Sequence, residues 1–450
     1  MKIDRSKKPS ISSKLIFKMP SYDKFVLKNN LDVYFIKKDA LPIIKINIVI
    51  YAGSKFEQPG KKGISNLLAM CIDEGAGEFD SLQLSEQFDL LGVQFSVNSN
   101  NDTIQLTLQT LKENFGKALE LIGKILISPH FDEKDFKREK RKILTSLKQL
   151  KDDPDYLAST SFKSLLFGKR NPYSFPFLGL EKDINNITNE EVVSYYRNYI
   201  FPNNSFIVIV GDISNKELNG GLDKYISCWK TGNFDVQFKS SDKSDEKVVY
   251  IVDKKDSVQT EIRTGHHTAK RNSKDYFPKH LLNTILGGQF SSRINLNLRE
   301  KRGYTYGAGS SYNYYKDSAY FSVSTSVGIE NSANALNEII KELNKIRDGV
   351  TEEELKFAKS SIVRKFPLNF ETNSQVASNF IGKVIYDLPN DHFDSYINNI
   401  NSVSIEDVNK AAQDSIFPEL ATTVLVGDKE KLIPQLKGKD FGKVEVVNIF

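Results

Sequence analysis

The side chains best suited to bind a metal ion are few in this chain, and their spacing provides no metal site. The two cysteines, Cys71 and Cys228, lie far apart and form no C-x-x-C pair. Adjacent His266 and His267 would point to opposite faces of a strand, so they could not chelate one ion together. The histidines are His130, His266, His267, His280 and His392. The pattern therefore predicts no metal ion bound by this chain.

Composition and charge narrow the classes of function. The chain has 450 residues, 62 of them Lys or Arg and 57 Asp or Glu, and so small an excess of positive charge does not indicate a nucleic-acid partner. No apolar run approaches the roughly 18 residues that a membrane span needs. The positively charged start, residues 1–14, has no apolar segment, so we expect no signal peptide in this numbering. Both a periplasmic and a cytoplasmic location stay open.

An internal repeat divides the chain into two halves of roughly 210 residues. Residues 187–212 align without a gap with residues 403–428. In each copy a Thr or Ser precedes an acidic helix start, a Phe-Pro pair ends the helix, and a β-branched run leads into Gly-Asp. The matches, all 216 positions apart, are Phe201 with Phe417, Pro202 with Pro418, Gly211 with Gly427 and Asp212 with Asp428.

The elements predicted in the first half indicate the fold class. Residues 31–38 and 43–53 have the pattern of strands, and the alternating run 93–110 that of a hairpin. Helices are predicted near 63–74, 81–91, 113–127 and 132–151. Strands in hairpins followed by helices indicate an α+β fold of two homologous domains, each a mainly antiparallel sheet with helices packed on one face. We place these domains at 20–230 and 248–450, joined by a polar linker at 231–247.

The segment GKKGISNLLAMCIDEGAGEFDS (60–81) resembles the metal-site helix of the insulinase/pitrilysin family of zinc peptidases, which includes the mitochondrial processing peptidase. In the family signature H-x-x-E-H, two histidines on one helix face bind zinc and the Glu activates a water. Aligned on Gly63, this chain has Asn66, Ala69 and Met70 at those positions. The third ligand of the family, a Glu, falls on Ser146. The resemblance implies a first half that has lost the zinc site and the catalytic base.

A second segment, LGGQFSSRINLNLREKRGYTYGAGSSY (286–312), is similar to the family's S-R-L-x-x-x-L-R-E-K-x-G-x-x-Y. The resemblance implies that Arg299 and Tyr306 face the substrate. An Arg fork can hold a peptide carbonyl or carboxylate, and a Tyr hydroxyl can donate to an oxygen that develops charge. An exposed helix end and an ordinary strand would also explain these two residue types, but the matching spacing favours substrate binding.

The surrounding sequence suggests how this second segment is built. Ser291 or Ser292 is suited to cap a helix, Gly303 to end it, and a strand is predicted over 304–311. Elsewhere, residues 152–180 resemble a family segment that ends in P-Y-G-x-P-x-x-G, with Asn171-Pro172-Tyr173 in place and Ser174 at the small residue. An ordered loop packed on the sheet explains this third segment adequately.

The resemblance extends from about residue 25 to about residue 447. It implies a non-catalytic, substrate-binding subunit of a heterodimeric zinc metallopeptidase that degrades or processes peptides in an enclosed chamber. Such a chain has no activity alone, and zinc belongs to a homologous partner with H-x-x-E-H. Two alternatives stay open: a structural or assembly subunit, like the core proteins of the respiratory bc1 complex, and a peptide-binding homodimer without proteolysis. Retention of Arg299 and Tyr306 favours the peptidase over the structural role.

Overall fold

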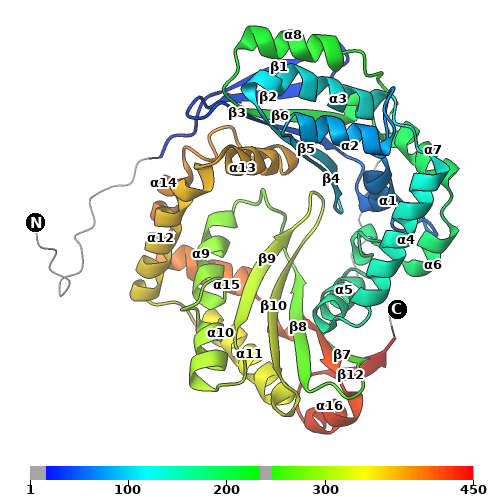
Figure 1. Cartoon of the computed structure of the whole chain (residues 1–450). Helices are drawn as coiled ribbons and strands as arrows, with labels where there is room; N and C mark the ends of the chain where they lie inside the picture. The colour runs from blue at the N-terminus through cyan, green and yellow to red at the C-terminus, as the bar shows by residue number, and fades with distance from the viewer. Residues whose placement is uncertain (1–16, 234–245, 449–450) are drawn as a thin grey trace, which may run out of the picture.

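Two six-stranded sheets form the framework of the computed structural model, which describes residues 17–233 and 246–448 (Figure 1). The first sheet has the order β1-β2-β6-β3-β5-β4 and the second β12-β7-β11-β8-β10-β9. The strands of the first are β1 Tyr22–Val26, β2 Asp32–Lys37, β3 Ile43–Ile50, β4 Gln94–Ser99, β5 Ile104–Leu111 and β6 Ser205–Gly211. Those of the second are β7 Val248–Asp253, β8 Gln259–His267, β9 Ala308–Tyr314, β10 Ala319–Gly328, β11 Thr422–Gly427 and β12 Lys443–Val447.

The two sheets correspond strand by strand. In the first, β2 and β6 are parallel and all other neighbours antiparallel. In the second, β7 and β11 are the parallel pair at the same place. The edge strand differs: β12 is parallel to β7, whereas β1 is antiparallel to β2. The strands at this edge come from opposite ends of the described chain, β1 from its start and β12 from its end (Figure 1). The predicted α+β class with two homologous halves is confirmed.

The sequence repeat is also a repeat of local structure. Thr188 begins α7 (Asn189–Tyr199) in a capping box with Glu191, and Ser404 begins α15 (Ile405–Ser415) in a capping box with Asp407. A short helical turn starting at the proline of Phe-Pro follows each helix, and strand β6 or β11 comes next. The predicted order of helix, break and buried strand is therefore confirmed in both copies.

The helices predicted in the first half are present, and their ends differ from the prediction by a few residues at most. Together with the others they cover the sheets, and the bounds that follow complete the element list. The first half has α1 Ile64–Cys71, α2 Ser81–Leu90, α3 Phe115–Ile127, α4 Glu133–Leu150, α5 Pro154–Phe167, α6 Glu181–Asn186, α7 and α8 Asn215–Tyr225. The second has α9 Tyr276–Leu286, α10 Arg293–Asn295, α11 Ser332–Arg347, α12 Glu352–Lys365, α13 Asn373–Ile385, α14 Tyr396–Ser402, α15 and α16 Lys429–Leu436.

One helix of each half packs on the sheet of the other half. Helix α5 packs on β11, β8 and β7, and α13 packs on β6 and β3 (Figure 1). Leu157, Phe162 and Leu166 of α5 form a separate core with Tyr250 and Val424 of the second sheet. We call this arrangement the helix exchange. In each half, the helix from the other half covers part of one sheet face, and the half's own helices pack on the other face.

Contacts beyond the helix exchange also join the halves. The turn between β9 and β10 reaches the first half, where Lys55 Nζ lies 2.8 Å from Asp317 and 3.0 Å from Asp102. The predicted linker, 231–247, falls largely on residues 234–245, outside the described residues. Within the described parts of the chain, no helix is both long and apolar enough to cross a membrane.

Candidate substrate-binding site and degenerate metal site

Helix α1 begins against a buried carboxylate. Glu57 accepts hydrogen bonds from the backbone N–H groups of Gly63 and Ser65, both at 2.9 Å, and from the Ser65 hydroxyl at 2.6 Å. Complete burial raises the pKa of Glu57 to about 7, although these donors oppose the change. Gly63 has φ +102°, and a Cβ there would come within 2.8 Å of Gly179 Cα, so the close approach requires glycine.

The side chains of α1 at the family's zinc positions cannot hold zinc. Asn66 is 8% exposed and Ala69 2%, while Met70 packs against the hydrophobic core of the first half. A carboxamide and a single thioether are poor zinc donors, and a methyl group supplies no base. Among the described residues, no group of three His, Cys, Asp or Glu side chains could hold a metal ion. The residues present therefore do not fit the zinc ion that the family signature implies.

Helix α4 packs against α1. At the position of the family's third ligand this helix has Ser146, which is exposed. Two carboxylates of this helix are buried, Asp135 and Glu139, and Glu139 is 3% exposed. Glu139 Oε1 lies 2.8 Å from Arg138 Nε and 2.7 Å from Lys142 Nζ, and Arg138 also pairs with Asp135 and Glu74. These cations neutralise the carboxylates next to the degenerate site.

His266, His267 and Cys71 pack within the fold. His266 accepts a hydrogen bond from the Phe417 N–H at 3.1 Å, whereas the His267 ring meets Phe167 of α5 at 5.2 Å between centroids. The two rings thus lie on opposite faces of β8, as predicted. Burial raises the pKa of the Cys71 thiol far above its usual range, which makes it inert.

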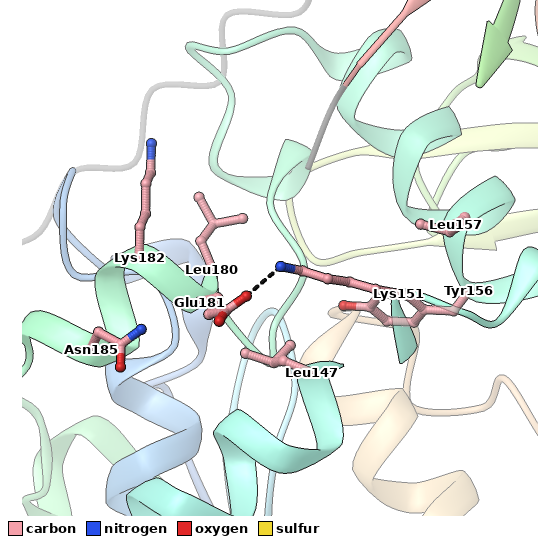
Figure 2. A pocket seen from close by; sticks show the side chains of 9 residues that line it. Leu147, Lys151, Tyr156, Leu157, Leu180, Glu181, Lys182 and Asn185 are labelled. Carbon is pink, nitrogen blue, oxygen red and sulfur yellow. Dashed lines mark hydrogen bonds and ion pairs between the residues drawn. The ribbon is translucent and has the colours of Figure 1, made fainter. Parts of the chain in front are cut away.

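A cavity of about 450 Å³ lies beside the last turn of α4 (Figure 2). Its apolar wall is formed by Leu147, Leu157 and Leu180, and Lys151 reaches across it to form an ion pair with Glu181. The remaining lining residues are Tyr156, Gly179, Lys182 and Asn185. The arrangement can hold an apolar group beneath a polar mouth. None of the predicted site residues lines this cavity, although Leu147 follows Ser146 directly.

Arg299 lies in an irregular helix end. After α10 the chain widens into one π-helical stretch, Leu296–Lys301, in which the Arg302 N–H bonds to the Asn297 carbonyl five residues back. Gly303 then ends the helix with φ +68°, as predicted, and its N–H bonds to the Arg299 carbonyl at 3.2 Å. The predicted serine cap is wrong: Ser292 occupies the N-cap position, but its hydroxyl makes no capping hydrogen bond.

The Arg299 side chain is held on an aromatic ring at the surface. Its guanidinium carbon lies 4.6 Å from the ring centroid of Phe290, and its Nε lies 3.4 Å from a Glu300 carboxylate oxygen. About 38% of the Arg299 side chain stays exposed, so the guanidinium is still free to bind a ligand.

Tyr306 is 91% exposed and lies in a loop, which corrects the prediction of a strand over 304–311. Strand β9 starts only at Ala308. The reason is local: the Thr305 hydroxyl accepts from the Gly307 N–H at 3.0 Å and donates to its carbonyl at 2.9 Å, a turn that competes with pairing. Thr325 of β10 holds this turn through the same Gly307 carbonyl at 3.0 Å.

The structure does not bring the two predicted sets of site residues together. Helix α1 and α10 lie on opposite sides of the molecule (Figure 1). Two neighbours of Arg299 were not predicted, Phe290 and Asn295, although both stand in the segment that carries the resemblance. A sequence cannot distinguish an exposed Phe from a buried one, and an Asn in a helix gives no sign of its partners.

Comparison with known proteins identifies the family. Residues 33–169 match the model described as insulinase (peptidase family M16), and residues 186–362 match the peptidase M16 inactive domain. A non-peptidase homolog, YmxG of Helicobacter pylori, is 26% identical over 408 residues, 89% of this chain and 92% of its own. An uncharacterized zinc protease, YmxG of Bacillus subtilis, is 24% identical over 407 residues, 89% of this chain and 97% of its own.

A solved structure agrees with this assignment at the level of the fold. The peptidase M16 inactive domain from Pseudomonas fluorescens superposes with a TM-score of 0.85 at 22% identity, covering 91% of this chain and 98% of its own. Two family models along one chain, relatives of matching length and the shared fold lead to one conclusion. The chain belongs to the insulinase family, peptidase family M16, and lacks that family's zinc-binding motif.

Proposed function

We propose that this chain is the non-catalytic, substrate-binding subunit of a heterodimeric zinc metallopeptidase. The partner is a homologous chain that carries H-x-x-E-H and supplies the zinc ion and the catalytic base. The observation that carries the proposal is the exposure of Tyr306 and Arg299 in a chain that has no zinc ligand at the family's positions on α1 and α4.

The backbone around these two side chains supports the proposal. Tyr306 stands 91% exposed on a turn that hydrogen bonds to Thr305 and Thr325 hold in place. A large aromatic side chain presented to solvent on such a fixed turn gains nothing for the fold, which favours a role in binding. Arg299, seven residues earlier in the sequence, is oriented by Phe290 and can grip a peptide carbonyl or carboxylate.

The arrangement of the helices supports the need for a partner. Helix α10, which directly precedes the segment with Arg299 and Tyr306, lies on the opposite side of the molecule from α1, so we place these two residues away from this chain's own degenerate site. In the proposed heterodimer they face the zinc of the other chain across the chamber. Enclosure there excludes folded proteins and orients the scissile peptide.

Reconstitution tests the proposal. The chain is mixed with an H-x-x-E-H homologue from the same organism, and hydrolysis of short fluorogenic peptides is measured for each protein and for the mixture. We expect activity from the mixture that neither protein has alone, together with a complex on size-exclusion chromatography. A partner that is fully active alone and gains nothing from this chain would overturn the proposal.

A further inference from the structure

Phe290, whose ring contacts Arg299, is a third exposed side chain of this segment. It is 63% exposed, although phenylalanine is among the residues most often buried. One side of its ring carries the Arg299 guanidinium at 4.6 Å. The rest of the ring is open to solvent, in the half of the chain that carries both predicted substrate-binding residues.

The conformation of the loop that contains Phe290 places this side chain at the surface. Gly287 accepts a hydrogen bond from the Ser310 N–H of β9 at 3.1 Å, and a Cβ on Gly287 would come within 2.4 Å of that same nitrogen. Only glycine allows the loop to pass so close to the strand. The Ser292 N–H then bonds to the Gln289 carbonyl at 3.1 Å, and this tight turn leaves Phe290 at the surface.

One buried amide fixes this loop to the loop that carries Tyr306. Asn295 is 4% exposed, and its Nδ2 donates to the Phe290 carbonyl at 2.7 Å. Its Oδ1 accepts from the Ala308 N–H at 3.0 Å, two residues after Tyr306. The Asn295 side chain on α10 thus helps to set the relative position of the two loops that carry the exposed aromatic residues, together with the bond between Gly287 and Ser310.

We propose that Phe290 determines specificity in the substrate-binding site, by packing against a large aromatic or aliphatic side chain of the bound peptide, and that Asn295 is its positioning residue. This inference rests on the proposed function. The open ring area is apolar, and Arg299 next to it is a cation suited to the backbone carbonyls of the same peptide. The site therefore selects peptides by an apolar side chain adjacent to a gripped backbone.

A binding experiment with the full chain tests the role of Phe290. The probes are two short fluorescein-labelled peptides of Ser, Thr and Ala, one with a single central Phe and one with Ala in its place. Fluorescence anisotropy gives both dissociation constants. We expect the wild-type chain to bind the Phe peptide about tenfold more tightly, and Phe290→Ala to abolish this difference. Any loss of the support that the ring gives to Arg299 weakens both peptides by the same factor and leaves their ratio unchanged. The control Leu296→Ala, at another exposed apolar residue of this segment, should preserve it.

The role of Asn295 is tested by a double-variant cycle. Asn295→Ala should lose the preference for the Phe peptide as Phe290→Ala does, and combining the two should add no further loss, because both act through one ring position. A merely structural loss would weaken both peptides equally. Peptide binding with the preference intact in Phe290→Ala would overturn this inference alone. Absence of binding by the wild-type chain would also overturn this inference, whereas the proposed function is decided by the reconstitution described above.

Discussion

The hydroxyl of Tyr173 donates a hydrogen bond of 2.6 Å to the carboxylate of Asp102, and both side chains are buried where the two halves meet. The same carboxylate lies 3.0 Å from Lys55 Nζ and accepts from the Lys316 N–H of the second half at 3.0 Å. The Tyr173 ring stacks on Tyr315 with centroids 4.3 Å apart. The segment recognised in the sequence by Asn171-Pro172-Tyr173 is thus part of the junction between the halves.

Tyr173→Phe should destabilise the fold, because it leaves a buried carboxylate with one donor fewer. We expect a loss of about 1–3 kcal/mol in the free energy of unfolding, measured by urea denaturation. Tyr156→Phe is the matched control, since no hydrogen bond of the Tyr156 hydroxyl is seen in the part of the chain that the structure describes. Equal stabilities of the two variants would show that the junction does not depend on this bond.

The purified chain should contain no zinc and should hydrolyse no peptide. The reason is the donor set: Asn66, Ala69, Met70 and Ser146 offer neither ligands nor a base. Elemental analysis and a peptidase assay check this expectation. About one tightly bound zinc per chain, lost to a chelator together with activity, would contradict it.

Restoring the four residues should not create an enzyme from this chain alone. The variant carries Asn66→His, Ala69→Glu, Met70→His and Ser146→Glu. Arg138 pairs with Glu74 and Glu139 beside this site, and the groups that would orient new ligands have not been restored. Zinc content and peptidase activity of the variant give the answer, and substantial turnover without a partner would refute the argument.

In the reconstituted complex, Tyr306→Phe and Arg299→Ala should have different kinetic effects. Loss of the hydroxyl should lower kcat by roughly 10²–10³-fold, as for other donors to a developing oxyanion. Loss of the guanidinium should also raise KM, because a grip on the peptide backbone contributes to ground-state binding. Initial rates over a range of peptide concentrations separate the two effects. Wild-type kinetics in both variants, with assembly confirmed, would favour a scaffold role.

Acid should weaken the second half through two buried histidines. Burial, together with the cation of Arg271, lowers the pKa of His280 and of His392 to about 4. Because the unfolded chain takes up these protons near the usual pKa of about 6.5, the stability they confer is complete above that pH and declines as pH falls toward 4. Each histidine accounts for roughly 3 kcal/mol at most.

His392→Phe isolates one of these histidines. It keeps a ring against Phe277, whose centroid lies 5.9 Å away, and removes the titration. Melting temperatures between pH 7 and pH 4 should then fall less steeply for the variant than for the wild type. An identical decline in both proteins would exclude His392 as a cause of acid sensitivity.

Much of the fold was predictable from local pattern. The capping residues Thr188 and Ser404 and the Phe-Pro breaks mark the repeat, because each acts within a few residues of itself. The strand predicted over 304–311 begins four residues too early, because the Thr305 hydroxyl and Gly307 form a turn, which strand periodicity does not register. The helix exchange was not predicted either. The apolar residues of α5 show that a face is buried, but not which sheet buries it.

For the candidate site, spacing selects Arg299 and Tyr306, and their role in substrate binding stays a prediction. Gly303 adopts the left-handed conformation that its place in the motif required. Phe290 and Asn295 could not be selected, because their relevance lies in an exposed ring and in two hydrogen bonds that join separate loops. Such relations between segments appear only once the backbone is placed.

The helix exchange sets the order in which a ribosome-bound chain can finish folding. Helix α5 is synthesised by Phe167, but one of the strands it packs on, β11, ends only at Gly427. At ~5–20 residues per second, Leu157, Phe162 and Leu166 lack that partner for a period on the order of tens of seconds. The nascent first half therefore exposes an apolar helix to which chaperones can bind or through which chains can aggregate. Expression of the first half alone should accordingly yield insoluble protein.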